Sequence, residues 1–88
     1  PTGQKPEEVT LRAYGPFADY LRKHPFHHSQ VERNDMGSFT SFDYTLLVTD
    51  ELVDEILALG DKVEITFPEK LRMKFLQKIG RIRSRYVI

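Results

Sequence analysis

Residues 49–68 read TDELVDEILALGDKVEITFP, and two hydrophobic periods meet in this stretch at Gly60. In the first half, apolar residues recur at intervals of three and four, which places them on one stripe of a helix: Leu52, Val53, Ile56, Leu57 and Leu59. Thr49 is a favourable N-cap, and Gly60 can adopt the left-handed conformation that ends a helix. This half therefore predicts an amphipathic helix that stops at the glycine.

After Asp61 the hydrophobic period changes to two, which is the repeat of a strand. Val63, Ile65 and Phe67 are expected to point toward a core, while the polar residues between them point away. Pro68 then ends the strand. A helix, a tight turn and a half-buried strand in succession indicate a layered α+β module.

Length and composition restrict the class of protein. The 88 residues suffice for one hydrophobic core, and no apolar run approaches the roughly 20 residues that span a bilayer. The chain has no cysteine, which excludes thiol catalysis, disulfides and cysteine-ligated metal centres. Because the chain starts at Pro1 without a signal sequence, we expect a piece of a longer protein, with residues 1–8 as a linker and residues 9–88 as one domain.

The charge of the chain is divided between two segments. Residues 69–88 contain seven basic residues and one acidic residue, a net charge of +6, while the rest of the chain carries −6. Such asymmetry is typical of a surface for nucleic acid or for an acidic partner. The structural alternative is that the basic segment docks on its own acidic body or is solvated.

The remaining segments complete a recognisable order. Residues 9–13 alternate as a strand, Gly15 and Pro16 break it, and residues 17–24 follow as a short helix. Residues 30–33 and 40–48 are expected to form a hairpin, with one face of its second strand in the core: Thr40, Phe42, Tyr44, Leu46 and Val48.

A third amphipathic helix is expected from Glu69 to Tyr86, running on through Gly80. The order β-α-β-β-α-β predicts a ferredoxin-like α+β fold, in which two helices lie on one face of a four-stranded antiparallel sheet. The third helix is an addition to this fold, at its C-terminal end. Because that fold serves unrelated functions, it does not select one.

Several short motifs together resemble a known family. They are Val9-Thr10-Leu11, Tyr20-Leu21, residues 25–30 (PFHHSQ), residues 56–65 (ILALGDKVEI), Pro68 and Leu71-Arg72. In this order and spacing they are similar to the C-terminal extension domain (WCX) of the WYL-domain transcriptional regulators of bacteria. Phe26 stands where leucine is common in that family, and the chain contains no tryptophan, so the Trp-Tyr-Leu motif of the central domain lies outside it.

The resemblance implies a regulatory module in a cytoplasmic DNA-binding protein. Its expected partners are the WYL and winged helix-turn-helix domains of the same protein, a second copy of the protein, and a nucleotide or single-stranded nucleic acid. No membrane partner is expected. Reading of a DNA sequence would belong to the absent winged helix. If the module lines a ligand site, the phosphate contacts are expected at Lys78, Arg81, Arg83 and Arg85.

The residues do not suggest an enzyme or a cofactor. His24, His27 and His28 form the only histidine cluster, and adjacent histidines entering a strand would point to opposite faces, so no metal site is expected. A structural role is expected instead, with His27, Ser29 and Gln30 bonding to backbone groups where the first helix gives way to a strand, and with Gly60 and Pro68 setting the later turns.

Two functional hypotheses remain open for the basic helix. Its cations can neutralise phosphates, and Tyr14, Phe39 or Tyr86 can stack on bases if they are exposed. No Lys/Arg-Gly-Phe-type motif supports an RRM, and Tyr86 is expected to seal the core. The alternative is a pure assembly domain that pairs through its sheet or its terminal helix and binds no ligand.

Overall fold

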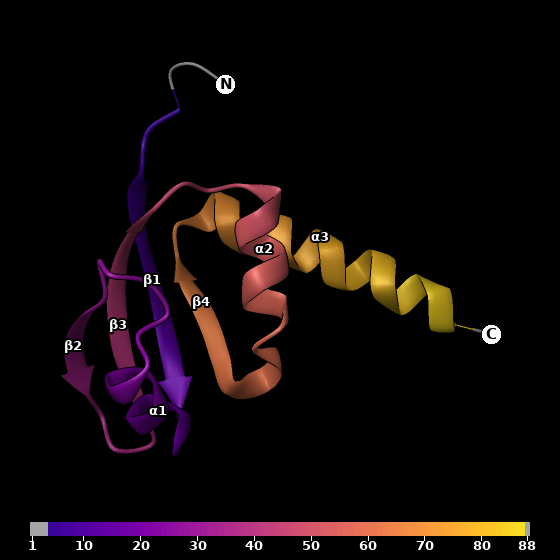
Figure 1. The fold of residues 1–88 in the computed structure, drawn as a ribbon. Helices are drawn as coiled ribbons and strands as arrows, with labels where there is room; N and C mark the ends of the chain where they lie inside the picture. Colours follow the sequence, from indigo (N-terminus) through magenta and orange to yellow (C-terminus); the bar gives the residue numbers. More distant parts are fainter. Residues whose placement is uncertain (1–3, 88) are drawn as a thin grey trace.

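Strand β1 (Glu7–Tyr14) occupies an inner position in a four-stranded antiparallel sheet of order β2-β3-β1-β4 in the computed structural model, which describes residues 4–87 (Figure 1). The other elements are α1 (Phe17–Lys23), β2 (Val31–Asp35), β3 (Phe39–Leu46), α2 (Asp50–Leu57), β4 (Val63–Phe67) and α3 (Glu69–Tyr86). The predicted ferredoxin-like order is confirmed, with α3 added at its end. Strand β1 starts at Glu7, so two residues of the expected linker belong to the sheet.

The core lies between one face of the sheet and helices α1 and α2. Alternate residues of β1 and β3 are buried there, as the period of two predicts: Val9, Leu11, Ala13, Thr40, Phe42, Tyr44 and Leu46. Leu52, Val53 and Ile56 cover them from α2, and Ala18 and Leu21 cover them from α1. The opposite face of the sheet carries the polar residues of both inner strands.

Helix α2 begins as its sequence predicts. The Thr49 side chain accepts a hydrogen bond of 3.1 Å from the Leu52 backbone N–H, which satisfies one of the free donors of the first turn. A turn of 3-10 helix (Gly60–Lys62) connects α2 to β4, and Gly60 has a φ of 64°. The left-handed conformation expected at this glycine is therefore confirmed.

The alternation expected in β4 holds for Val63 and Ile65 but is wrong for Phe67. Ile65 pairs with Leu11, whereas Phe67 pairs with Thr10, so Thr66 is an extra residue in a β-bulge. The bulge reverses the facing of the next side chain, because residues directly opposite in an antiparallel pair share one face. Phe67 consequently lies on the open face of the sheet, 51% exposed.

Helix α3 starts after Pro68 and continues through Gly80, as expected. Leu71 is fully buried and Phe75 packs against the core. Figure 1 shows the rest of the helix projecting away from the sheet and from α2. The chain therefore forms a layered body with one helical arm.

Candidate functional site

The outer half of α3 exposes four apolar side chains that define what we call the outer stripe: Leu76, Ile79, Ile82 and Tyr86. They are spaced by three and four residues, so they follow one side of the helix. Tyr86 was expected to seal the core, and this is wrong, since it is 79% exposed. The reason is geometric: the last turns of α3 project beyond α2 and the sheet, so neither covers Tyr86 (Figure 1).

The inner half of α3 is anchored by ion pairs to the acidic body. Three lysines of one side are involved: Lys70 with Glu7 at 2.6 Å, Lys74 with Asp50 at 3.5 Å, and Lys78 with Asp54 at 2.9 Å. Each joins exposed groups and is worth at most about 1 kcal/mol. Part of the basic segment thus docks on its own body, the structural alternative considered from the sequence.

The four predicted phosphate contacts are not all on one side of the helix. Lys78, Arg81 and Arg85 are separated by three and four residues and share a side, whereas Arg83 lies about 140° around the axis from Lys78. Among residues 4–87, Lys78 is the one member of the four with an ion pair. The three arginines are exposed and keep their guanidinium groups available to an external anion.

A polar hollow of about 290 Å³ lies between α2 and α3. It is lined by Asp50, Val53, Lys74, Gln77, Lys78 and Arg81. Lys74 and Lys78 are paired there with Asp50 and Asp54, so Arg81 is the one cation of the lining without an ion pair among residues 4–87. The hollow therefore offers a phosphate group the guanidinium of Arg81 beside two lysines that already have acidic partners.

The aromatic residues on the open face of the sheet are already engaged with their neighbours. The Arg12 guanidinium lies over the Phe39 ring, 4.3 Å from its centroid, and Tyr14 donates a 2.6 Å hydrogen bond to Glu64. A base could stack on Phe39 only by displacing Arg12. These contacts favour a structural role for Tyr14 and Phe39.

The histidines lie in the turn between α1 and β2, and not at the start of a strand. The rings of His27 and His28 are 4.1 Å apart, so the expectation that they point to opposite faces is wrong. His27 Nδ1 accepts a 3.1 Å hydrogen bond from the Ser29 backbone N–H. Within residues 4–87 no cluster of three or more histidine or acidic side chains is arranged to hold a metal ion.

Ser29 and Gln30 connect this turn to the core. Ser29 Oγ accepts a hydrogen bond of 2.9 Å from the Thr45 backbone N–H. The Gln30 side chain donates to the Leu21 carbonyl at 2.9 Å and accepts from the Phe26 backbone N–H at 3.1 Å. These bonds satisfy backbone groups at the end of α1, where no helical partner is left for them.

The motif around these residues is also part of what the family comparison recognises. A family model for the WCX domain matches residues 5–83 of the chain. The chain belongs to the WCX domain family. This is the family that the sequence resemblance indicated, the C-terminal extension of WYL-type regulators, and it makes the chain a regulatory accessory domain. Among curated proteins, no sequence matches the chain.

The matched range includes every strand of the WCX domain and most of α3. Arg81 and Arg83 fall inside it, while Arg85 and Tyr86 lie beyond its end. In the part of the chain that the structure describes, no helix has the length and apolarity that crossing a bilayer requires.

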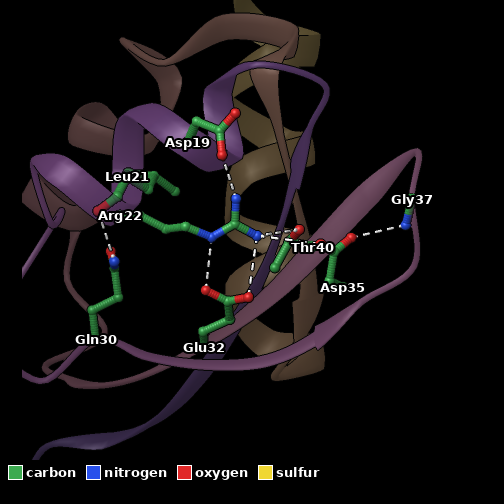
Figure 2. Close-up of polar contacts among 8 residues, drawn as sticks. All are labelled: Asp19, Leu21, Arg22, Gln30, Glu32, Asp35, Gly37 and Thr40. Atoms are coloured by element: carbon green, nitrogen blue, oxygen red, sulfur yellow. Dashed lines mark hydrogen bonds and ion pairs between the residues drawn. The ribbon is translucent and has the colours of Figure 1, made fainter.

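The WCX domain also contains a charge cluster that sequence reasoning missed. Arg22 of α1 forms a bidentate pair with Glu32 of β2, at 2.8 and 3.1 Å (Figure 2). It also contacts Asp19, Asp35 and Thr40. The hydrogen bond from Arg22 lowers the pKa of Glu32. The sequence offered one local sign of this cluster, because Asp19 and Arg22 are three residues apart on a predicted helix. Glu32 and Asp35 belong to β2, which comes next to α1 only when the chain folds.

Proposed function

We propose that this WCX domain is a non-catalytic accessory module of a WYL-type DNA-binding regulator and that it joins two subunits through α3. The observation that supports this proposal is the outer stripe, whose side chains are 36–79% exposed on the end of α3 that projects from the body. An isoleucine or leucine side chain contributes roughly 1.5–3 kcal/mol when it passes from water into a fully buried contact. Ile79 and Ile82 are 36% and 37% exposed, so more of the apolar surface left to bury belongs to Leu76 and Tyr86, which are 52% and 79% exposed.

The partner that best fits this surface is a second copy of the chain. Arg83 lies about 40° around the helix from Ile79, beside the stripe, and has no ion pair among residues 4–87. Glu51 and Glu55 of α2 are exposed and similarly unpaired there. The zero net charge of the chain imposes no overall repulsion between two copies. The net charge of +6 on residues 69–88 of one copy and the net charge of −6 on the remaining residues of the other copy are opposite in sign and would attract.

A matched pair of variants tests the assembly. Ile79→Lys combined with Ile82→Lys places two charges in the stripe, whereas Gln77→Lys adds a charge about 160° around the helix from Ile79 and about 140° from Ile82. In sedimentation velocity across a concentration series, the parent and Gln77→Lys are expected to form dimers, and the double variant is expected to stay monomeric. A monomeric parent, or a double variant that dimerises equally well, would refute assembly through α3.

A second candidate function is the binding of a phosphate-bearing ligand in the polar hollow. The observation that favours it is the presence of Lys74, Lys78 and Arg81 around one space, with Asp50 as the opposing charge. Titration with a short single-stranded oligonucleotide at two salt concentrations distinguishes the candidates. Phosphate contacts predict an affinity that falls steeply with salt and drops in Arg81→Gln, while assembly through apolar groups predicts a dimer that persists in high salt.

A further inference from the structure

A second, apolar hollow lies at the end of the sheet, away from α3, where two turns meet. It has a volume of about 530 Å³ and is lined by Tyr14, Pro16, Phe17, Tyr20, Leu59 and Lys62. Small-molecule sites in proteins typically enclose about 300–1,000 Å³ and have mostly apolar and aromatic walls. In size and lining the hollow resembles such a site.

The walls are held by turns of defined backbone conformation. Gly15, in the turn between β1 and α1, has a φ of 55°, and Gly60, in the turn that leads to β4, has a φ of 64°. Both values belong to the left-handed region, which glycine adopts without strain. The first turn presents Tyr14 and Pro16, and the second presents Leu59 and Lys62. The hollow is therefore built by backbone geometry and does not depend on one flexible side chain.

One wall offers aromatic ring faces. The rings of Phe17 and Tyr20 are nearly parallel, with an interplanar angle of 15° and centroids 5.3 Å apart. Tyr20 is 53% exposed, so a large part of this stacked pair remains in contact with solvent. Because the His24 ring is the second neighbour of Tyr20, with centroids 4.8 Å apart, a planar ring of a ligand can pack at the Phe17 end of the stack or along its exposed ring edges.

The rim of the hollow carries one positive charge. Lys62 Nζ lies 6.0 Å from the centroid of the Phe17 ring, and Lys62 has no ion pair among residues 4–87. No carboxylate is among the residues that line the hollow, and the nearby Glu64 accepts a 2.6 Å hydrogen bond from the Tyr14 hydroxyl. A single cation above an apolar, aromatic floor is complementary to a single anionic group on an aromatic ring.

We propose that this hollow binds a small planar aromatic anion, whose ring lies against Phe17 and Tyr20 and whose carboxylate or phosphate pairs with Lys62. The site shares no residue with α3. It therefore goes beyond subunit assembly, and each proposal can fail without the other. For a regulatory accessory domain, such a site is a place where a small effector can act.

The test is a titration of the whole chain, uniformly labelled with ¹⁵N, followed by chemical-shift changes. Three probes separate the contributions: 2-naphthoate and 2-naphthyl phosphate carry the anion, and 2-naphthamide has the same ring without charge. Both anions are expected to shift the amides around residues 14–20 and 59–62 and to bind more tightly than the amide. The tighter of the two anions identifies whether the site prefers carboxylate or phosphate.

Two variants and a control complete the experiment. Lys62→Gln should weaken binding of the anions about fivefold, the usual strength of an exposed ion pair, and leave 2-naphthamide unchanged. Tyr20→Ala should weaken all three probes, and Lys23→Gln, on α1 but outside the hollow, should change none. Shift changes centred on the outer stripe, equal affinity for the amide and the anions, or no effect of Lys62→Gln would overturn the proposal.

Discussion

The Tyr44 hydroxyl donates a 2.7 Å hydrogen bond to the side-chain carbonyl of Gln30. Tyr44 is 1% exposed in the middle of β3, and its burial raises the pKa of the phenol above its ordinary value. Gln30 carries this bond together with its bonds to Leu21 and Phe26. One amide side chain thus joins the core to the turn that contains His27 and His28.

Removal of Gln30 is expected to cost more than removal of its partner hydroxyl. Gln30→Ala leaves the Tyr44 hydroxyl and two backbone groups without partners and should lower the free energy of unfolding by about 2–3 kcal/mol. Tyr44→Phe removes one bond and should cost about 1 kcal/mol. Urea denaturation measures both losses, provided that the dependence of the free energy of unfolding on urea concentration is the same in the variants and the parent. As a control, Gln77→Ala at an exposed position should change the free energy of unfolding by no more than about 0.5 kcal/mol. Equal losses for the first two variants would contradict this account of the turn.

The pair between Arg22 and Glu32 predicts a dependence of stability on pH. The pKa of Glu32 is lowered in the folded chain from an ordinary value of 4.5, mainly by the hydrogen bond from Arg22 and against the charges of Asp35 and Asp19. A lowered pKa contributes stability above pH 4.5, and this contribution is lost as the pH falls through the lowered value.

Thermal unfolding between about pH 3 and pH 7 measures this contribution. Glu32→Gln should lower the melting temperature at neutral pH and approach the parent at acidic pH. Glu51→Gln, on an exposed carboxylate of α2 without an ion pair in residues 4–87, is the matched control. A constant difference between Glu32→Gln and the parent at all pH values would show that the pair does not titrate as described.

Two glycines are expected to respond to alanine in opposite directions. Gly60→Ala forces a side chain into a φ of 64° and should destabilise the chain by about 1 kcal/mol. Gly80 lies in the interior of α3, where a methyl group would meet nothing within 4 Å, so Gly80→Ala should stabilise the helix by about 1 kcal/mol. Circular dichroism during thermal unfolding reports both changes. A destabilising Gly80→Ala would indicate that the arm needs flexibility at this point.

The bulge in β4 predicts different costs for two residues that look equivalent in the sequence. Ile65 faces the core and is 5% exposed, so Ile65→Ala should cost about 2–4 kcal/mol. Phe67 lies on the open face, and Phe67→Ala should cost about 1 kcal/mol, the value for a half-exposed side chain. Chemical denaturation measures the free energy of unfolding of the two variants. A larger loss of stability in Phe67→Ala than in Ile65→Ala would show that Phe67 is buried in the core.

Much of the fold follows from the sequence because its signals are local. The stripe of α2, the cap at Thr49, the turn at Gly60 and the alternation in β3 each depend on residues close together in the chain. The bulge at Thr66 could not be predicted, since it arises from the register between β1 and β4. The cluster around Arg22 was missed for the same reason, because its carboxylates come from separate elements.

The candidate site was predicted in part. The sequence identifies the basic helix and its length, but periodicity cannot tell where a helix leaves the body that covers its apolar side. Tyr86 fits a buried position by spacing and is exposed because the sheet does not reach it. Lys78 fits a phosphate contact by charge and is also paired with Asp54 of α2. Both differences depend on distances between elements.

The central claim is that two copies meet along the outer stripe of α3, and a distance between copies tests it most directly. The chain has no cysteine, so Ser84→Cys gives a single attachment point for a spin label, on the side of α3 away from Ile82. We predict a defined dipolar coupling between labels of two copies, which disappears when Ile79→Lys and Ile82→Lys are added. Absence of intermolecular coupling at every protein concentration, or coupling that survives both lysines, would contradict the account.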